Sequence, residues 1–252
     1  MSMKILMIVF VAASVACQTE RNMDSATAGP PDAPAMTDTY ESESAAVPSA
    51  QLPSGDSSRA KVTVLFFGTS LTAGYGLDPE QAFPNLVAAT AMRSGLPITA
   101  VNAGQSGETS AGALRRIEWT LQRPVDIVVL ETGGNDALRA LDPDSLKANL
   151  SGIVRRIRAS QPRVRILLAV MEAPPNLGQR YTAQFRKAYA DVALQERLIL
   201  VPFLLDGVAG RTDLNLPDGV HPNLRGERIV ADNVWRALRP AVEEVYATKR
   251  KG

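Results

Sequence analysis

Between residues 61 and 252 the sequence alternates between short apolar runs, rich in β-branched residues, and stretches whose apolar residues recur at helical spacing. The apolar runs show no alternation with polar residues, which indicates strands buried on both faces. Such strands, separated by helices, predict one parallel sheet with helices on both sides, because right-handed crossovers leave few other arrangements. The expected strands are 62–67, 97–102, 125–131, 164–170 and 198–202.

The clearest expected helix follows the third strand. Asp142 is a suitable N-cap for it, and Pro143 suits its first turn. Its apolar face, at spacings of three and four, consists of Leu146, Leu150, Ile153, Val154 and Ile157. Similar but weaker patterns cover 79–93, 109–122, 179–196 and 226–247. The order predicts an α/β fold, a three-layer α/β/α sandwich around a five-stranded parallel sheet of flavodoxin-like topology.

Polar loops follow four of these strands. They read GTSLTAGYG after the first strand, NAGQSGETS after the second, ETGGNDALR after the third and LPDGVHPN after the fifth. The carboxyl ends of parallel strands share one edge of a sheet, and that edge carries the functional crevice in open α/β folds. We therefore expect one rim to gather Ser70, Gly104, Asn135, Asp218 and His221.

These residue types suit acyl transfer at a serine. The hydroxyl of Ser70 needs a base, and His221, the single histidine, is the residue type best matched to neutral pH. Asp218 lies three residues earlier and can hold the imidazole so that its other nitrogen faces Ser70. The N–H groups of Ser70 and Gly104 and the side chain of Asn135 are candidate donors to the oxyanion that develops on the substrate.

Each of these residues also has a plainer interpretation. Ser70 can cap a helix, and Asp218 with Gly219 can form an ordinary turn. His221 can cap the last helix, and Asn135 can close a turn after two glycines. Their joint occurrence at expected strand ends, in this order, favours the catalytic interpretation.

The first 17 residues indicate an export signal. Lys4 precedes a short apolar stretch that is too short for a good membrane span. The only cysteine, Cys17, follows Ala16 as in the lipobox of bacterial lipoproteins, which predicts lipidation of Cys17. Ser14 departs from the branched aliphatic residue usual in a lipobox, so plain cleavage and an incidental cysteine stay open as alternatives.

Residues 18–60 differ in composition from the rest of the chain. They consist mainly of Ala, Ser, Thr and Pro with a single aromatic residue, Tyr40, which predicts a disordered tether. By the lipoprotein rule, Gln18 indicates the outer membrane. We expect an exported protein of the cell envelope or periplasm, and a globular domain over 61–252.

The charge of the chain limits its expected partners. Its 27 Lys and Arg residues balance 26 Asp and Glu residues, for a formal net charge of +1. This composition gives no broad basic surface for nucleic acid. We expect a monomer whose partner is a small-molecule or lipid ester, and contact with a membrane only through the lipid anchor.

Four blocks of the sequence, FFGTSLTAGYGL, VNAGQSGETS, GGND and DGVHPN, occur in the order found in one enzyme family. On these blocks the chain resembles the SGNH (GDSL-type) hydrolases over 61–245. The nearest branch is the small bacterial arylesterases that also act as acyl-CoA thioesterases and lysophospholipases. The resemblance implies Ser70 as nucleophile, Gly104 and Asn135 as oxyanion donors, and Asp218 with His221 completing the triad. It implies no metal and no organic cofactor.

One residue departs from the family pattern. Thr69 stands where the family usually has aspartate before the nucleophile, and we expect this change to affect the rigidity of the turn or the rate rather than the assignment. Thr72 stands where a G-x-S-x-G motif would have its second glycine, which argues against the α/β-hydrolase elbow.

The resulting functional expectation is a serine esterase for short- to medium-chain acyl esters, aryl esters, thioesters or lysophospholipids. An acyl pocket is expected from Leu71, Tyr75, Leu138, Pro174, Pro175 and Leu177, although these residues can equally pack the end of the sheet. Two alternatives remain: a glycan O-deacetylase of the same family, and a non-catalytic, flavodoxin-like surface lipoprotein.

Overall fold

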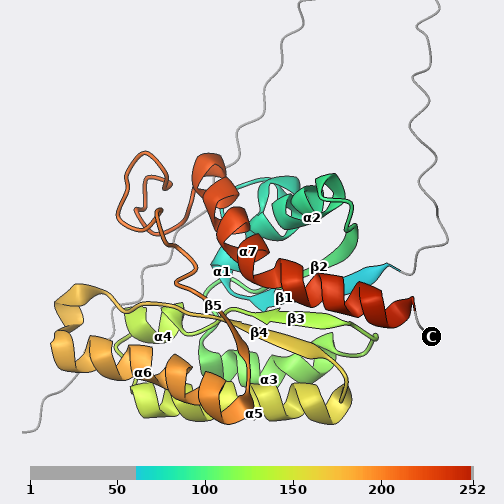
Figure 1. Ribbon diagram of the computed structural model, residues 1–252. Helices are drawn as coiled ribbons and strands as arrows, with labels where there is room; N and C mark the ends of the chain where they lie inside the picture. Colours follow the sequence, from blue (N-terminus) through green and yellow to red (C-terminus); the bar gives the residue numbers. More distant parts are fainter. Residues whose placement is uncertain (1–60, 251–252) are drawn as a thin grey trace, which may run out of the picture. The chain divides into compact units, whose positions relative to one another are not determined.

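The computed structural model describes residues 61–250, in which five strands form one sheet with every neighbouring pair parallel (Figure 1). The strands are β1 (Val62–Gly68), β2 (Ile98–Gly104), β3 (Ile127–Leu130), β4 (Arg165–Ala169) and β5 (Ile199–Val201). Their order, β2-β1-β3-β4-β5, is that of flavodoxin-like sheets. The predicted fold class is confirmed.

Helices cover both faces of this sheet (Figure 1). One face carries α2 (Phe83–Arg93) and α7 (Leu224–Lys249), which pack against each other. The other carries α3 (Ser110–Thr120), α5 (Pro143–Ser160) and α6 (Gln179–Glu196). The predicted cap is present, because the Asp142 carboxylate accepts the N–H groups of Asp144 and Ser145 at the start of α5.

Four short helices complete the described chain. They are α1 (Ser70–Ala73), α4 (Gly134–Leu138) and the 3₁₀-helices η1 (Pro79–Gln81) and η2 (Pro175–Leu177). The sequence pattern did not predict α1 and α4, since helices of four and five residues are too short to show a period. The predicted helix 79–93 is divided, with η1 and α2 on either side of Ala82.

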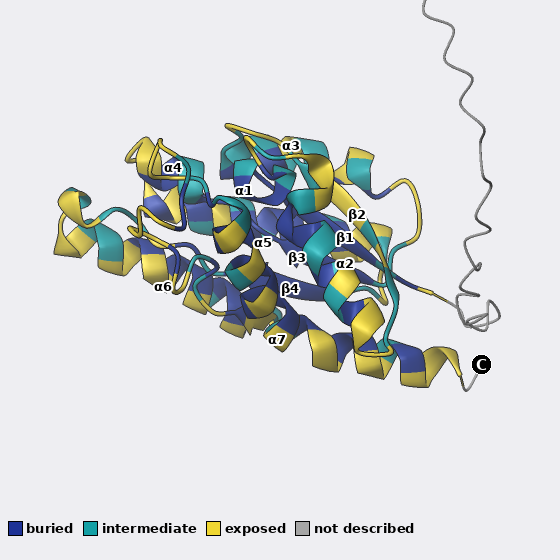
Figure 2. Cartoon of the chain, turned by 90° about the horizontal axis from the view of Figure 1, so that it is seen from above, coloured by how far each residue is buried: buried dark blue, intermediate teal, exposed yellow. Residues whose placement is uncertain are grey.

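The central strands form the core. All four residues of β3 are buried, and in β1 only Thr63 is partly exposed (Figure 2). The Phe66 ring meets the Phe83 ring of α2 edge to face, with 5.8 Å between centroids. The edge strand β2 differs from expectation, because none of its residues is fully buried. It has a neighbouring strand on one side only, so its apolar run does not reflect burial on both faces.

A buried carboxyl group links the two helices of the first face. Glu227, in the first turn of α7, accepts the backbone N–H of Phe83 at 2.6 Å. Burial raises the pKa of Glu227 to about 8; the bond from Phe83 opposes this rise and the charge of Glu131 adds to it. Glu227 therefore carries its proton at neutral pH.

The sheet topology sets where a site can form. From β2 at one edge, the chain passes over β1 and enters the sheet again at β3. Connections after β1 and β3 consequently leave in opposite directions, and a crevice opens between them at the carboxyl ends of these strands. Two short helices lie at this crevice: α1, which follows β1, and α4, which follows β3.

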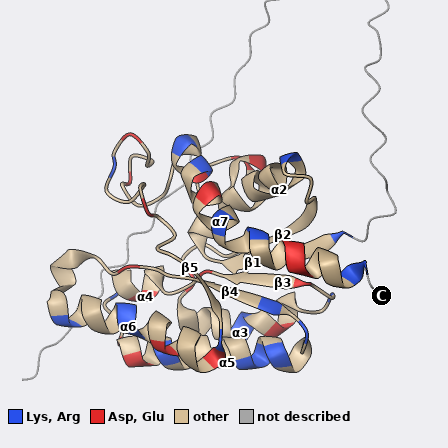
Figure 3. Cartoon of the chain, in the orientation of Figure 1, with Lys and Arg blue, Asp and Glu red and all other residues tan. Residues whose placement is uncertain are grey.

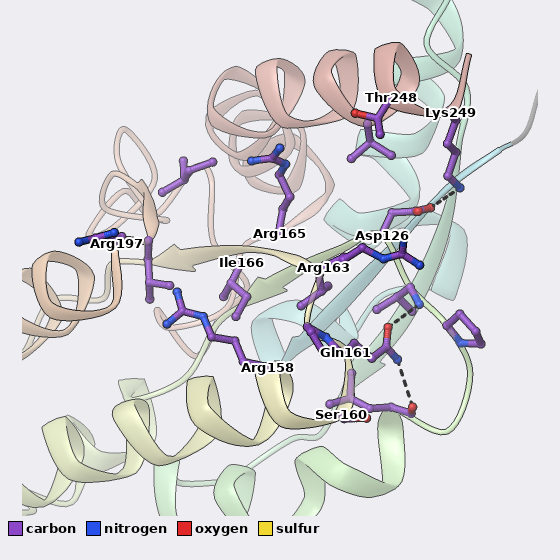
Figure 4. Close-up of a pocket in the computed structure, with 18 of the residues that line it drawn as sticks. Asp126, Arg158, Ser160, Gln161, Arg163, Arg165, Ile166, Arg197, Thr248 and Lys249 are labelled. Atoms are coloured by element: carbon purple, nitrogen blue, oxygen red, sulfur yellow. Dashed lines mark hydrogen bonds and ion pairs between the residues drawn. The ribbon is translucent and has the colours of Figure 1, made fainter. Parts of the chain in front are cut away.

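The opposite end of the strands carries a basic groove of about 1050 Å³, between the ends of α5 and α7 (Figure 4). Figure 3 shows Lys and Arg positions in blue at the ends of both helices. The basic residues that line it are Arg158, Arg163, Arg165, Arg197 and Lys249. Three of them already form ion pairs: Arg158 with Glu196, Arg165 with Glu244, and Lys249 with Asp126. The groove lies at the amino ends of β3, β4 and β5, away from the crevice.

The predictions for the N-terminal part lie outside the described residues. These are the export signal 1–17, the lipidation of Cys17 and the tether 18–60. Among residues 61–250, no helix has the length and apolar character needed to cross a membrane.

Candidate active site

Three side chains form a continuous chain of hydrogen bonds at the crevice. His221 Nε2 lies 2.9 Å from Ser70 Oγ, and His221 Nδ1 lies 2.7 Å from Asp218 Oδ2. With Nδ1 donating to the carboxylate, Nε2 is left as an acceptor for the serine hydroxyl. The structure thus brings together the three residues that the sequence predicted as a triad, in an arrangement able to move a proton from Ser70 to His221.

Ser70 is placed by the turn that ends β1. It is the first residue of α1, where the carbonyl of Thr69 accepts the N–H of Ala73 at 3.0 Å and that of Ser70 accepts the N–H of Tyr75 at 3.0 Å. At the first position of a helix, the N–H of Ser70 has no intrahelical acceptor. It has no hydrogen-bond partner among residues 61–250 and is free to meet a ligand.

The buried carboxylate of Glu131 holds this turn in place through hydrogen bonds. Glu131, the residue after β3, accepts the backbone N–H of Thr69 at 2.7 Å and its hydroxyl at 2.9 Å. The Thr72 hydroxyl donates to the same carboxylate at 2.9 Å. Burial raises the pKa of Glu131, and the bonds from Thr69 and Thr72 oppose that rise. Thr69, the residue that departs from the family pattern, therefore serves as a donor to Glu131.

The loop before α7 holds Asp218 and His221 in register. Asp218 Oδ1 accepts the N–H groups of Val220 at 2.9 Å and His221 at 3.0 Å, which leaves Oδ2 for the imidazole. The backbone bond from His221, its side-chain bond and the bond from Val220 lower the pKa of Asp218 to about 2. Tyr75 covers the imidazole, with 4.5 Å between the ring centroids. Asp218 is thus ionised over the whole neutral range.

Gly104, predicted as an oxyanion donor, lies outside the pocket at Ser70 in this structure. Its N–H donates to Asn102 Oδ1 at 2.9 Å, within the end of β2, and it does not line the pocket at Ser70. A Cβ at this position would lie 2.2 Å from the backbone nitrogen of Ala73. Gly104 is therefore a close-packing residue that lets β2 approach α1.

Gly107, three residues later in the same block, lines the pocket instead. Its N–H has no hydrogen-bond partner within 61–250, and its φ of 77° lies in the left-handed region that favours glycine. Asn135, in α4, also lines the pocket, and its Nδ2 donates one hydrogen to the carbonyl of Glu108 at 3.1 Å. The second hydrogen of this amide is left for a ligand, so Ser70, Gly107 and Asn135 supply three donors around one space.

The pocket beside Ser70 has a volume of about 360 Å³. Of the six residues predicted for an acyl pocket, Leu71, Tyr75, Leu138 and Pro174 line it. Pro175 and Leu177 do not, because the chain turns into η2 after Pro174 and leads away to α6. Lining residues that the sequence analysis missed are Ser106, Met171, Glu172, Leu205 and Val220. Met171 and Glu172 lie two and three residues after the end of β4, so their place at a strand end was the signal that could have found them.

The described residues include no cluster of side chains suited to binding a metal ion. Nowhere in 61–250 do three or more His, Cys, Asp or Glu side chains gather in a way that could hold a metal ion. The one histidine of the chain is already bonded to Asp218 and Ser70.

The chain is similar to known proteins over the region that carries this site. Residues 66–229 match the model of the GDSL-like Lipase/Acylhydrolase family. Esterase TesA of Pseudomonas aeruginosa is 40% identical over 183 residues, which are 72% of this chain and 90% of TesA. The arylesterase of Vibrio mimicus is 32% identical over 182 residues, 72% of this chain and 90% of its own.

Two further similarities extend this picture. Thioesterase 1/protease 1/lysophospholipase L1 of Escherichia coli (strain K12) is 32% identical over 181 residues, 71% of this chain and 85% of its own. Among solved structures, the crystal structure of TesA matches with a TM-score of 0.68 at 39% identity, covering 71% of this chain and 99% of that one.

Proposed function

The chain belongs to the GDSL-like lipase/acylhydrolase family, and from this premise we propose that it is a serine esterase that cleaves carboxylic esters through an acyl-enzyme on Ser70. The observation that carries the proposal is the unbroken series of hydrogen bonds from Asp218 through His221 to Ser70, which opens into a pocket with unpaired donors. A base in contact with a serine, and itself oriented by a carboxylate, is the arrangement that nucleophilic catalysis needs.

The first half-reaction forms the acyl-enzyme. Ser70 Oγ attacks the ester carbonyl carbon while its proton passes to His221 Nε2, and Asp218 stabilises the imidazolium that results. The carbonyl oxygen becomes an oxyanion that accepts from the N–H groups of Ser70 and Gly107 and from Asn135 Nδ2. Collapse of this intermediate breaks the bond to the leaving oxygen, which takes the proton from His221.

The second half-reaction releases the acid. Water enters the place of the departed alcohol and gives a proton to His221 as its oxygen attacks the acyl carbon. The second tetrahedral intermediate is held by the same three donors, and its collapse returns the proton to Ser70 Oγ. Every step uses residues of this chain, and the scheme needs no metal or organic cofactor.

For substrates we propose short- to medium-chain acyl esters, including aryl esters, thioesters and lysophospholipids. The walls contributed by Leu71, Leu138, Met171, Leu205 and Val220 are apolar and suit a hydrocarbon acyl group. The names of the similar proteins, an esterase, an arylesterase and a thioesterase/lysophospholipase, support the same range. These walls favour hydrocarbon acyl chains over a site restricted to acetyl groups on a glycan.

Hydrolysis of p-nitrophenyl acetate, butyrate, octanoate and palmitate tests the proposal. We expect turnover by the wild-type chain, with the highest kcat/KM at short to medium length, and a loss of at least about 1000-fold in Ser70→Ala and His221→Ala. Ser160→Ala, an exposed serine of the basic groove, is the matched control and keeps wild-type activity. No turnover of any ester, or an active Ser70→Ala protein, contradicts the proposal.

For the N-terminal part we propose an exported lipoprotein with Cys17 as the lipid-bearing residue and an outer-membrane location. The support is the sequence around Cys17 alone. Labelling cells with a radiolabelled fatty acid tests it: label on the wild-type chain and none on Cys17→Ala is expected. Equal label on both proteins, or none on either, contradicts it.

A further inference from the structure

Arg139 joins the two segments that carry the proposed oxyanion donors. Its Nη1 donates to the carbonyl of Asn135 at 3.1 Å, and its Nη2 donates to the carbonyl of Gly107 at 3.2 Å. One planar guanidinium therefore spans α4 and the loop after β2. The side chain is exposed, and no carboxylate of residues 61–250 forms an ion pair with it. Its contacts are with the two carbonyls rather than with an opposite charge.

The loop after β2 is anchored on both sides of Gly107 by other groups. The N–H of Gln105 donates to the carbonyl of Gly68 at 2.9 Å, and the Glu108 carboxylate accepts from Arg116 at 2.7 Å. Between these anchors the carbonyl of Gly107 has Arg139 as its one partner among residues 61–250. The N–H of Glu108, in the same peptide unit as this carbonyl, donates to the carbonyl of Gln105 at 3.3 Å and closes the turn. Because glycine in the left-handed region is free to turn, the bond from Arg139 adds a second contact that restrains the orientation of this peptide unit.

Helix α4 is held in place without Arg139. The buried Asp136 carboxylate accepts the N–H of Ser110 at 2.8 Å and its hydroxyl at 2.5 Å, which ties α4 to the start of α3. At its other end, the N–H of Leu141 donates to the carbonyl of Asp136 at 2.9 Å, and Tyr181 donates to the carbonyl of Leu141 at 2.6 Å. Loss of Arg139 would thus loosen the Gly107 peptide, which keeps only the bond from Glu108 N–H to Gln105, while the helix that carries Asn135 stays in place.

We propose that Arg139 is a positioning residue that fixes the Gly107 and Asn135 donors relative to each other for the esterase reaction proposed above. This role rests on the proposed esterase function, since it gives Arg139 a part in stabilising the oxyanion. Donors preorganised around a developing charge stabilise the transition state more than the bound ester. Removal of the clamp should therefore lower kcat and leave KM nearly unchanged.

The fork of the guanidinium is the part of the side chain that matters. Two N–H groups in fixed geometry reach two carbonyls at once, whereas a lysine ammonium is a point charge on a flexible stem. Lysine at 139 keeps the positive charge near the site without the bridge. Comparing Arg139→Lys with Arg139→Ala therefore separates the geometric effect of the clamp from a long-range effect of its charge on the oxyanion.

The test is steady-state hydrolysis of p-nitrophenyl butyrate by the full chain. We expect Arg139→Ala to lower kcat by roughly 10- to 100-fold, with KM within about twofold of wild type. Arg139→Lys should lose most of the same factor. Arg155→Ala is the matched control, because Arg155 is an exposed helical arginine whose side chain makes no hydrogen bond or ion pair with any described residue. It should match the wild type.

Two further readings distinguish positioning from a merely structural role. In an Asn135→Ala background, Arg139→Ala should lower kcat much less than it does in the wild type, because one of the two clamped donors is already missing. Free guanidinium at low millimolar concentration should raise the kcat of Arg139→Ala several-fold and leave that of Asn135→Ala unchanged.

Several results would overturn the inference. One is an Arg139→Ala protein with the same kcat as Arg155→Ala, and another is a change in KM without a change in kcat. A third is that the losses of kcat in Arg139→Ala and Asn135→Ala are additive. A fourth is that Arg139→Ala has a lowered Tm and is partly unfolded at the assay temperature, to an extent that accounts for its loss of kcat. Each requires an active wild type. An inactive wild type contradicts the proposed function instead, so the two failures are distinguishable.

Discussion

Thr69 donates both its backbone N–H and its hydroxyl to the buried carboxylate of Glu131, at 2.7 and 2.9 Å. This pair fixes the backbone directly before the proposed nucleophile and links the ends of β1 and β3, the two strands between which the crevice opens. In many family members an aspartate would stand at position 69. In this chain a second carboxyl group there would face Glu131 across hydrogen-bond distance.

We therefore predict that Thr69→Asp destabilises the protein, and more so as the pH rises. Two carboxyl groups in one buried site cannot both ionise, so the folded state must keep a proton that the unfolded state releases above about pH 4. The free energy of unfolding should fall between pH 5 and 8 relative to Thr69→Ser, which keeps the hydroxyl. Urea denaturation at several pH values measures it. The double variant Thr69→Asp/Glu131→Gln should remove the pH dependence; its persistence would show that Glu131 is not the partner.

A second prediction concerns Asp218. Asparagine there keeps the size of the side chain but removes the charge that stabilises the imidazolium, so Asp218→Asn should lower kcat by about 100-fold or more. Stability gives an independent reading. The folded pKa of about 2 lies below the unfolded value, so Asp218 adds stability above about pH 4 that is lost as the pH falls towards 2. Asp218→Asn should show a smaller loss over that window, and an equal loss contradicts the assignment.

The two glycines of the second block should respond differently to alanine. At Gly104 a Cβ meets backbone atoms of Ala73, which cannot move aside as a flexible side chain would. Gly104→Ala should therefore lower Tm by several degrees. At Gly107 no atom lies within 4 Å of an added Cβ, and the cost is the strain of a positive φ, about 1 kcal/mol. Thermal unfolding of both variants decides this, and a Gly104→Ala protein with wild-type Tm would refute the packing role.

Glu227 should make stability depend on pH in the neutral range. Its folded pKa of about 8 exceeds the unfolded value, so the contribution of protonated Glu227 to the free energy of unfolding is fully present below about pH 4. That contribution is lost as the pH rises from about 4 through about 8. Glu227→Gln keeps an acceptor for the N–H of Phe83 without the ionisation. The variant should gain a few kcal/mol over wild type between pH 5 and 9 in urea denaturation. Parallel curves would contradict it.

Most of the architecture was predictable because each strand is encoded locally. The run at β3 is apolar at every position, and α5 carries its cap at Asp142 and its apolar stripe in one continuous segment. The edge strand β2 shows the limit: its residues are as β-branched as those of a central strand, but its burial depends on which strands lie beside it. That information belongs to the topology and not to the segment.

The site was predictable to the level of the loop and not always of the atom. The expected strand ends were sufficient to predict that Ser70, Asn135 and His221, which are far apart in sequence, lie close together. The sequence pointed to Gly104 and not to Gly107, because a block of sequence does not say which amide is already bonded, and the Gly104 amide donates to Asn102. Arg139 escaped notice for the same reason, since its partners are backbone carbonyls that leave no mark in the sequence.

The central claim is that Ser70 becomes covalently acylated, and capture of the nucleophile tests it most directly. The chain is treated with diethyl p-nitrophenyl phosphate, which phosphorylates an activated serine and releases p-nitrophenol, and the product is mapped by mass spectrometry. We predict one equivalent of p-nitrophenol, loss of esterase activity and a single diethylphosphoryl group on Ser70, with no adduct in Ser70→Ala and a greatly slowed reaction in His221→Ala. Full inactivation with the adduct on another residue, or continued ester hydrolysis by a chain modified at Ser70, would contradict the account.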